Sequence, residues 1–242
     1  MLPFNKALLI IPTYNEIDNI EKMLIKVTST YPDLSILIIE DGSPDGTADV
    51  VKEYMSKDSN IHMIERTGKL GLGTAYITGF KWALERDYEF VFEMDCDFSH
   101  DPDDLSRLLE AAQTNDLVIG SRYIDGIRII NWPFHRLLLS YGASIYTRII
   151  TGLDVLDVTG GFKCFSRKAL DSLNLDRVFS NGYSFQVELN FKIWSKGLRI
   201  KEVPIVFTER RDGESKMSGG IVKEAIFAVI MLRIRKIFGR LD

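Results

Sequence analysis

Short apolar segments alternate with longer amphipathic segments through the first half of the chain. The short segments are typical of buried strands, and we expect strands over residues 7–11, 34–39, 61–65, 88–94 and 116–120. Helices are expected between them, over residues 15–31, 47–57, 74–86 and 102–113, with Asn15 as the N-cap of the first. Strands that alternate with helices indicate βαβ units. The fold class is therefore predicted to be α/β, with a mainly parallel sheet and helices on both faces.

The pattern changes after Gly120, where residues 131–152 form a long amphipathic segment rich in large apolar residues. The elements expected there are a helix over 131–152, a strand over 161–166, a helix over 185–196, a strand over 203–208, a charged loop over 209–219 and a final helix over 221–238. No repeat and no low-complexity linker separates the two halves. We therefore expect one compact unit.

Two aspartates, Asp95 and Asp97, end the predicted strand at residues 88–94. Side chains alternate along a strand, so both carboxylates should point to the same side. Open α/β sheets bind ligands at the carboxyl ends of their strands. Paired carboxylates there suit a hard divalent cation that shares its other positions with a phosphorylated substrate. The alternative, equally compatible with the motif alone, is that the two acids cap the helix that begins near Pro102.

Other strand ends of the first half also carry acids, namely Glu16 and Asp41. Each can cap the helix that follows it. Together they predict several carboxylates along one edge of the sheet, whose repulsion a cation or the hydrogen-bond donors of a nucleotide would offset. Tyr14 offers a ring for a nucleobase, although packing is the simpler explanation for a single tyrosine. The glycine-rich segment 68–73 matches neither the P-loop nor the dinucleotide spacing, and we assign it no catalytic role.

Basic residues follow later strand ends and enter the loop near the C-terminus. Each one alone is explained as a solvated surface residue. As a group facing an acidic metal site, they could bind phosphate, the arginines in bidentate fashion. The members of this group are Arg122, Arg136, Arg210, Arg211 and Lys216.

Composition narrows the classes of function. The chain has 242 residues, and its 45% hydrophobic and 26% charged content is that of a globular protein. The net charge of −4 argues against nucleic-acid binding, which needs a basic face. Cys96 and Cys164 form neither a metal-binding spacing nor a disulfide framework, which favours a reducing compartment. The N-terminus has no signal-peptide pattern.

No segment has the ~18 consecutive apolar residues expected of a membrane span. The final helix has a broad apolar surface flanked by Lys223, Arg233, Arg235, Lys236 and Arg240. This pattern suits an interfacial helix on an anionic bilayer. Packing of the helix on the sheet or on another protomer explains it equally well.

Six motifs occur in an order that resembles family 2 glycosyltransferases, and more narrowly the dolichol-phosphate (polyprenol-phosphate) mannosyltransferases. They are Pro-Thr-Tyr-Asn-Glu (12–16), Glu-Asp-Gly-Ser-Pro-Asp-Gly-Thr (40–47), Lys-Leu-Gly-Leu-Gly-Thr-Ala-Tyr (69–76), Met-Asp-Cys-Asp-Phe-Ser-His (94–100), Gly-Ser-Arg-Tyr (120–123) and Arg-x-x-Gly-Glu-Ser-Lys (210–216). Each motif is loose by itself, but the ordered set is specific. The resemblance implies a GT-A fold, in which a Rossmann-like, mainly parallel sheet is flanked by helices.

The resemblance also implies an activity and its site residues. The expected reaction moves mannose from GDP-mannose to a polyprenyl phosphate with the help of Mg²⁺ or Mn²⁺. The implied nucleotide-binding positions are Pro12, Tyr14, Glu16, Ile39 and Asp41. The implied metal and diphosphate positions are Asp95, Cys96 and Asp97. The resemblance also implies that the donor or the lipid phosphate contacts Arg122, Arg210 and Lys216, with Arg136 as a further basic position. Arg122, Arg210 and Lys216 would then share catalysis with Asp95 and Asp97.

Three residues depart from the family pattern. Glu40 stands where Asp is frequent and Cys96 where Ala is usual, and both changes are conservative enough to be tolerated. Ser99 stands where some relatives carry a Gln that helps to ligate the metal. The remaining metal ligands are therefore not assigned.

We expect a catalytic domain over residues 1–219 and a C-terminal amphipathic helix over residues 220–242 that contacts the membrane interface. The resemblance implies a peripheral protein on the cytoplasmic face of a membrane, with a membrane-protein partner or a homo-oligomer as further possibilities. Two other functions remain compatible with the sequence. One is a related transferase that uses UDP-glucose or a non-lipid acceptor, and the other is a non-catalytic nucleotide-sugar-binding scaffold.

Overall fold

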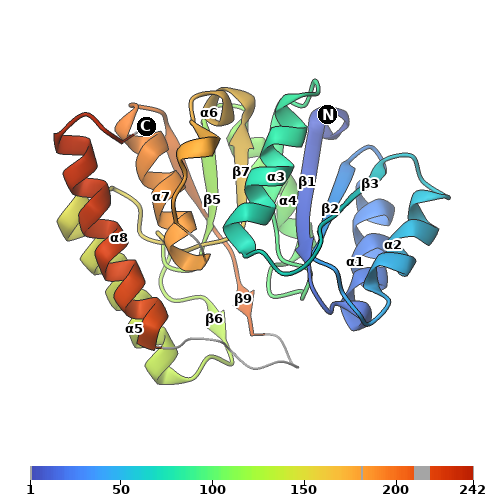
Figure 1. The fold of residues 1–242 in the computed structure, drawn as a ribbon, viewed down its shortest axis with the longest axis horizontal. Helices are drawn as coiled ribbons and strands as arrows, with labels where there is room; N and C mark the ends of the chain where they lie inside the picture. Colours follow the sequence, from blue (N-terminus) through green and yellow to red (C-terminus); the bar gives the residue numbers. More distant parts are fainter. Residues whose placement is uncertain (1, 181, 210–218, 242) are drawn as a thin grey trace.

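The computed structural model describes residues 2–180, 182–209 and 219–241 (Figure 1). Within these ranges, seven strands form one sheet in the order β3-β2-β1-β4-β7-β5-β8. All neighbouring strands are parallel except β7, which runs antiparallel to β4 and to β5. These strands are β1 (Ala7–Thr13), β2 (Ser35–Glu40), β3 (Ile61–Glu65), β4 (Phe90–Glu93), β5 (Leu117–Ser121), β7 (Lys163–Ser166) and β8 (Ile200–Pro204). The predicted mainly parallel α/β sheet is confirmed.

Helices cover both faces of the sheet (Figure 1). They are α1 (Ile17–Thr30), α2 (Thr47–Met55), α3 (Leu72–Leu84), α4 (Leu105–Ala112), α5 (Phe134–Thr151), α6 (Arg167–Asp171), α7 (Gly182–Ser195) and α8 (Gly219–Ile237), with short 3₁₀ turns η1 (Phe4–Lys6), η2 (Pro102–Asp104) and η3 (Leu175–Arg177). Side chains of β1 alternate between the two faces. Leu8 and Ile10 enter the core under α3, α6 and α7, whereas Leu9 and Ile11 enter the core under α1, α2 and α4.

The prediction of a single strand over residues 203–208 is wrong. Strand β8 ends at Pro204, and residues 207–208 form a separate strand, β9 (Phe207–Thr208), that pairs with β6 (Ile129–Ile130). The chain leaves the main sheet at Pro204, and Ile205 donates its N–H to the Ser121 carbonyl at 3.0 Å. The segment after β8 therefore passes in front of the carboxyl ends of the strands and joins the residues that precede α5.

The predicted N-cap of the first helix is also wrong. Asn15 has a φ of 58°, and the N-cap of α1 is Glu16, whose side chain makes no capping bond. The loop after β2 supplies the acceptors instead. Ser43 Oγ, Thr47 Oγ1 and Asp45 Oδ2 accept the N–H groups of residues 15, 16 and 17 at 3.0, 3.1 and 3.1 Å. Two of the recognised motifs are thereby bound to each other.

Helices α5 and α8 lie side by side at one end of the sheet and run in the same direction (Figure 1). Tyr146 Oη donates to the Ile226 carbonyl at 3.1 Å, and Arg233 reaches the Thr151 carbonyl at 3.5 Å. Val229 and Leu232 anchor α8 in the core beneath α7. In the parts of the chain that the structure describes, no helix combines the length and apolarity needed to cross a bilayer.

Candidate active site

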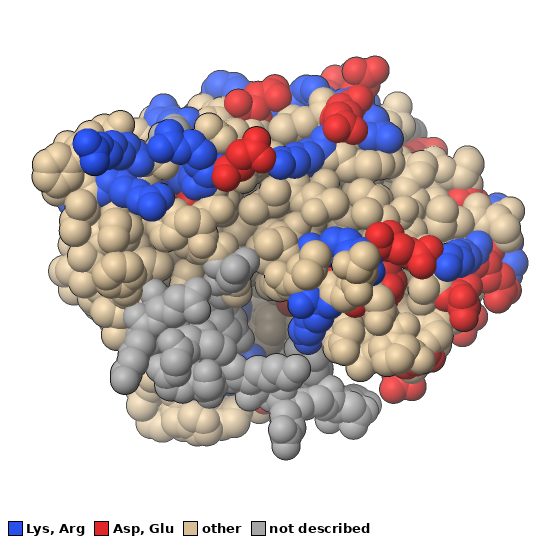
Figure 2. All heavy atoms as spheres, viewed as in Figure 1, with Lys and Arg blue, Asp and Glu red and all other residues tan. Residues whose placement is uncertain are grey.

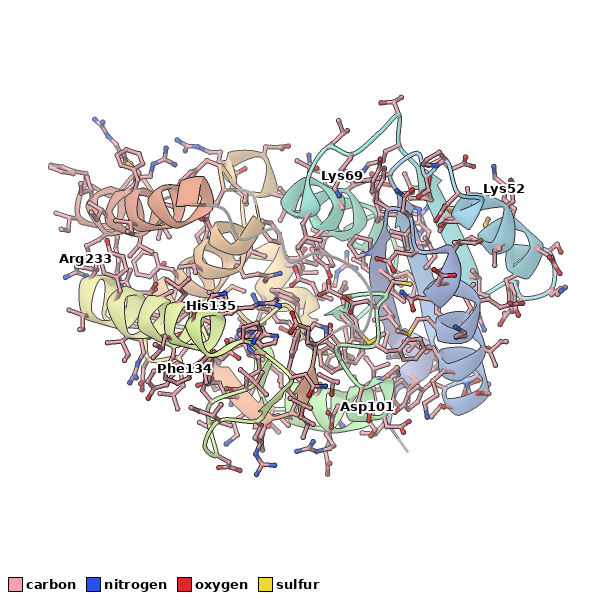
Figure 3. All side chains as sticks on the ribbon, turned by 90° about the horizontal axis from the view of Figure 1, so that it is seen from below. Lys52, Lys69, Asp101, Phe134, His135 and Arg233 are labelled. Atoms are coloured by element: carbon pink, nitrogen blue, oxygen red, sulfur yellow. The ribbon has the colours of Figure 1, made fainter. Side chains whose placement is uncertain are left out.

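Three strand ends meet at the carboxyl edge of the sheet, as the sequence predicts. Strand β1 lies between β2 and β4 and is parallel to both, so their ends bring together Glu16, Asp41 and the Asp95/Asp97 pair. Both aspartates are partly exposed, and Cys96 between them is buried. Figure 3 looks onto this edge, with Lys69 on one side of the strand ends and Asp101 on the other.

The two aspartates do not cap the next helix, which was the alternative explanation for them. The N-cap of η2 is Asp101, whose side chain accepts the N–H of Asp103 at 3.0 Å. Asp97 instead closes a turn, because its Oδ1 accepts the N–H of Ser99 at 3.0 Å. The two carboxylates thus stand at the sheet edge ahead of the helix rather than at its first turn.

A divalent cation fits this pair only if the substrate completes its coordination. The described residues contain no group of three or more His, Cys, Asp and Glu side chains that could hold a metal. Mg²⁺ is, however, commonly held by one or two carboxylates together with substrate phosphates. Asp95, with 40% of its side chain exposed, and the partly exposed Asp97 meet that requirement.

Arg66, which is not among the residues predicted from the sequence, fixes the acidic end of β2. Its guanidinium lies 2.6 Å from Asp41, and the two side chains are only 8% and 9% exposed. Arg66 also donates to Thr74 Oγ1 at 2.8 Å, which connects this strand end to the first turn of α3. The position of Arg66 directly after β3 could have revealed it, because β3 is parallel to β2 and ends at the same edge of the sheet.

The remaining residues implied to bind nucleotide have different surroundings. The Lys69 ammonium lies 4.4 Å from the centroid of the Tyr14 ring, and Glu16 accepts a hydrogen bond from Asn19 at 2.8 Å. Ile39 is fully buried in the core and pairs with the partly exposed Pro12 across β1 and β2. Because Ile39 is 0% exposed, it lies beneath the surface that a nucleotide would contact.

Arg122 is held by a buried carboxylate that the sequence analysis missed. Asp157 is fully buried and accepts from Arg122 Nε at 2.7 Å, from Nη2 at 2.6 Å and from the backbone N–H at 2.9 Å. Glu202 of β8 in turn accepts the backbone N–H of Asp157 at 2.9 Å. The Arg122 guanidinium also lies 5.3 Å from the Trp132 ring and 5.6 Å from the Phe207 ring. Arg122 is therefore fixed on the side of the edge away from β2.

Arg136, near the start of α5, lies on the same side. Its guanidinium is 4.1 Å from the Trp132 ring and forms an ion pair with Glu209. Trp132 thus has two arginines near its ring. The other basic positions expected at the site, Arg210, Arg211 and Lys216, lie outside the residues that the structure describes.

A buried pair of opposite charges lies on β4 and β7, next to the aspartates. Glu93 faces Lys163 across the two strands, and both are fully buried. Burial raises the pKa of Glu93 to about 7 and lowers the pKa of Lys163 to about 8. Lys163 donates to the side chain and to the carbonyl of Gln186 on α7. Glu93 precedes Asp95 by two residues, so this cluster supports the strand end that carries the aspartates.

His100 connects the aspartates to the Arg122 side of the edge. Its Nδ1 lies 3.9 Å from Asp95 Oδ2, and its ring packs against Phe162 and Phe207 at centroid distances of 5.1 and 5.2 Å. The side chain is 4% exposed. Burial lowers the pKa of His100 to about 4, and the negative charge of Asp97 only partly opposes this effect.

We expect His100 to make the protein less stable as the pH falls. Its pKa is about 4 in the fold and ~6.5 in an unfolded chain, so the unfolded state binds more protons between these values. The free energy of unfolding should fall through this window by up to about 1.4 kcal/mol per pH unit relative to a His100→Gln variant. Urea unfolding followed by circular dichroism at pH 7, 6 and 5 measures this difference. Parallel pH profiles of the two proteins would contradict the assignment.

Residues 8–173 match the pattern of the family described as glycosyl transferase family 2. This match spans more than half of the chain. The chain belongs to glycosyl transferase family 2. The resemblance read from the six motifs is confirmed, and the acidic strand ends and Arg122 lie within the matched segment.

Two curated relatives match nearly the whole chain. An undecaprenyl-phosphate mannosyltransferase from Micrococcus luteus is 47% identical over 224 residues, which cover 93% of this chain and 92% of the relative. A polyprenol monophosphomannose synthase from Mycolicibacterium smegmatis is 45% identical over 242 residues, which cover 99% of this chain and 90% of the relative. The similarity therefore extends beyond the matched family segment into α7 and α8.

Solved structures of other transferases share the fold. A glucosyl-3-phosphoglycerate synthase from Mycobacterium tuberculosis, in complex with Mn²⁺, UDP and glucosyl-3-phosphoglycerate, aligns with a TM-score of 0.65 at 18% identity, covering 98% of this chain and 80% of that one. A mannosyltransferase from Pyrobaculum calidifontis, in complex with GDP-Man and Mn²⁺, aligns with a TM-score of 0.56 at 18% identity, covering 97% and 72%. These likenesses confirm the predicted GT-A architecture.

Proposed function

We propose that this family 2 glycosyltransferase moves mannose from GDP-mannose to a polyprenyl phosphate. The observation that carries the proposal is the position of Asp95 and Asp97, between the acidic strand ends on one side and Arg122 and Arg136 on the other. Support comes from the two relatives at 47% and 45% identity, whose names both specify mannosyl transfer involving a polyprenyl carrier.

The donor nucleotide is assigned to the edge formed by β1, β2 and β3. There, Asp41 is held by Arg66 at 2.6 Å, and Tyr14 lies against Lys69. A fixed carboxylate can accept hydrogen bonds from base or ribose, and an aromatic ring can stack on the base. The diphosphate would then lie at the end of β4, next to Asp95 and Asp97.

Mg²⁺ or Mn²⁺ bound at Asp95 and Asp97 would stabilise the charge that develops on the leaving nucleoside diphosphate. Mn²⁺ in the solved transferase complexes supports this role. Asp97 is pre-positioned by the bond from the Ser99 N–H at 3.0 Å. Glu93 and Lys163 face each other across β4 and β7, two residues before the first of these carboxylates.

The acceptor phosphate is assigned to the side of Arg122 and Arg136. A phosphate oxygen is already anionic at neutral pH, so it needs positioning more than deprotonation, and we assign no general base. Arg122 and Arg136, with Arg210 and Lys216, would offset the repulsion between acceptor and donor. Attack from the face opposite the leaving group would invert the anomeric carbon and give a β-linked mannosyl phospholipid.

A transfer assay with competing donors tests the proposal. The full-length protein would receive Mn²⁺, polyprenyl phosphate in detergent micelles, and either labelled GDP-mannose or labelled UDP-glucose. We expect label in the organic phase from GDP-mannose only. Label from UDP-glucose alone would select the related transferase. No extractable label from either donor would contradict the proposal and leave a transferase with a non-lipid acceptor or a binding role.

We further propose that α5 and α8 contact the membrane that holds the acceptor. Large apolar side chains are exposed along both helices. On α5 they include Phe134 (72% exposed) and Ile149 (75%), and on α8 they include Phe227 (64%) and Ile237 (65%). Because the helices lie side by side, their exposed side chains can form one surface. Such a surface supports an interfacial location.

Replacing exposed apolar residues should weaken vesicle binding without unfolding the protein. We expect Phe227→Ser with Ile237→Ser to lower the vesicle-bound fraction at least about ten-fold, because full burial of even one large apolar side chain is worth about 1.5–3 kcal/mol. Flotation with liposomes measures the bound fraction. Ile25→Ser with Met55→Ser is the matched control, since these residues are exposed on α1 and α2. Equal flotation of both double variants would contradict the assignment of α8.

A further inference from the structure

We propose that a groove between α8 and residues 176–179 binds the headgroup of one anionic phospholipid. The groove has a volume of about 520 Å³, within the ~300–1,000 Å³ range of small-molecule sites. Its lining is formed by Asp176, Arg177, Val178, Phe179, Met231, Ile234, Arg235, Phe238 and Arg240. The proposal rests on the membrane contact proposed above and not on the transfer reaction.

The polar part of the lining is cationic. Arg177, Arg235 and Arg240 contribute three positive charges, and the single acid, Asp176, lies 2.5 Å from Lys81. The whole chain has a net charge of −4, so this region is opposite in sign to the average surface. Figure 2 shows Lys and Arg side chains gathered at the upper left, over the C-terminal end of α8. Guanidinium groups bind phosphate oxygens in bidentate fashion.

The rest of the lining is apolar and connects to the exposed surface of α8. The Arg235 guanidinium lies 4.2 Å from the centroid of the Phe179 ring, which holds it at the edge of the apolar part. Ile234 and Phe238 line the groove and are 42% and 70% exposed. They continue the apolar stripe that includes Phe227. A ligand that fits both parts has an anionic head next to a hydrocarbon chain.

The groove is distinct from the proposed acceptor site. Arg233, two residues before Arg235, reaches the carbonyl of Thr151 at the last residue of α5, whereas Arg136 lies near the start of that helix. A rise of 1.5 Å per residue puts Thr151 about 22 Å along α5 from Arg136. The polyprenyl phosphate that reacts at Asp95 and Asp97 therefore cannot be the molecule whose phosphate contacts Arg235.

An anionic phospholipid satisfies these features together. Its phosphodiester can contact the arginines while its acyl chains lie against Ile234 and Phe238, at the depth where interfacial helices lie. A glutamate-rich peptide would use the charges but would leave these apolar side chains exposed. Occupation of the groove would fix the C-terminal end of α8 at the headgroup level and so set the orientation of the protein on the bilayer.

Native mass spectrometry of the full-length protein tests the groove, with short-chain phosphatidylglycerol or phosphatidylcholine below micelle-forming concentrations. We expect one retained phosphatidylglycerol and no retained phosphatidylcholine. Arg235→Gln with Arg240→Gln should lower the retained fraction at least ten-fold. The matched control is Arg233→Gln with Lys201→Gln, which removes the same charge from exposed positions outside the groove and should lower it less than three-fold.

Three results would overturn the proposal. Equal losses in the two double variants would indicate attraction to general surface charge. Inorganic phosphate that displaces phosphatidylglycerol at equal concentration would indicate a free-anion site, and a hexaglutamate peptide that binds in preference to the lipid would indicate a protein partner. Mannosyl transfer in phospholipid-free micelles should stay at the wild-type rate in the Arg235/Arg240 variant. The experiments can therefore refute the lipid-binding groove without refuting the proposed transfer reaction, and the reverse.

Discussion

Asp97→Asn is expected to lower mannosyl transfer by about 10³-fold or more while the protein stays folded. Asn keeps an oxygen that can accept the Ser99 N–H now bound at 3.0 Å, but it removes one of two charges proposed to hold the cation. Loss of one stabilising group at a developing anion commonly costs 10²–10³ in rate, and a weakened metal site adds to this loss. Initial rates across a Mn²⁺ titration measure the effect.

Asp101→Asn is the matched control for Asp97→Asn. Asp101 belongs to the same loop and is exposed, but it serves as the N-cap of η2. The control should keep wild-type turnover and metal dependence, with at most a loss of about 1 kcal/mol in stability. Thermal unfolding of both variants checks the fold. Wild-type turnover of Asp97→Asn at limiting Mn²⁺ would refute the metal role.

Asp157→Ala is expected to destabilise the protein by about 3–5 kcal/mol and to reduce activity. The change leaves the Arg122 guanidinium, now 7% exposed, without the carboxylate that lies 2.6 Å away. Removing one partner of a buried ion pair has a cost of this size, whereas replacing both partners with apolar residues is often neutral. Urea unfolding measures the loss.

The double variant Arg122→Met with Asp157→Leu separates stability from function. We expect it to recover most of the stability lost in Asp157→Ala, because no buried charge is left unpaired. Its transfer rate should stay low, because the cation assigned to the acceptor side is gone. A double variant that regains both stability and activity would show that the pair has only a structural role.

The main features of the fold follow from the sequence because they depend on local periodicity. The apolar segments before Asp41 and Asp95 predict strands, and the helices between them predict a parallel sheet. Because parallel strands end at one edge, the meeting of Glu16, Asp41 and Asp95 could also be predicted. The split of residues 203–208 into β8 and β9 could not, because it depends on pairing with β6, which is far away in the chain.

The partners of the candidate site residues could not be predicted from the sequence. Asp157 and Arg66 are polar residues in otherwise ordinary segments, and their importance comes from buried ion pairs that only the tertiary structure reveals. Glu93 and Lys163 were overlooked because charged residues are rarely fully buried. The capping of α1 by the loop after β2 was missed because the acceptors lie in a different segment of the chain from the helix and its own N-cap.

The most direct test of the account measures both products of one reaction. Full-length protein would be incubated with GDP-mannose, Mn²⁺ and polyprenyl phosphate, and GDP and mannosyl lipid would be quantified at each time point. We expect equal amounts of the two products, and loss of both on chelation of the metal or in Asp97→Asn. Release of GDP without an equal amount of mannosyl lipid would contradict it.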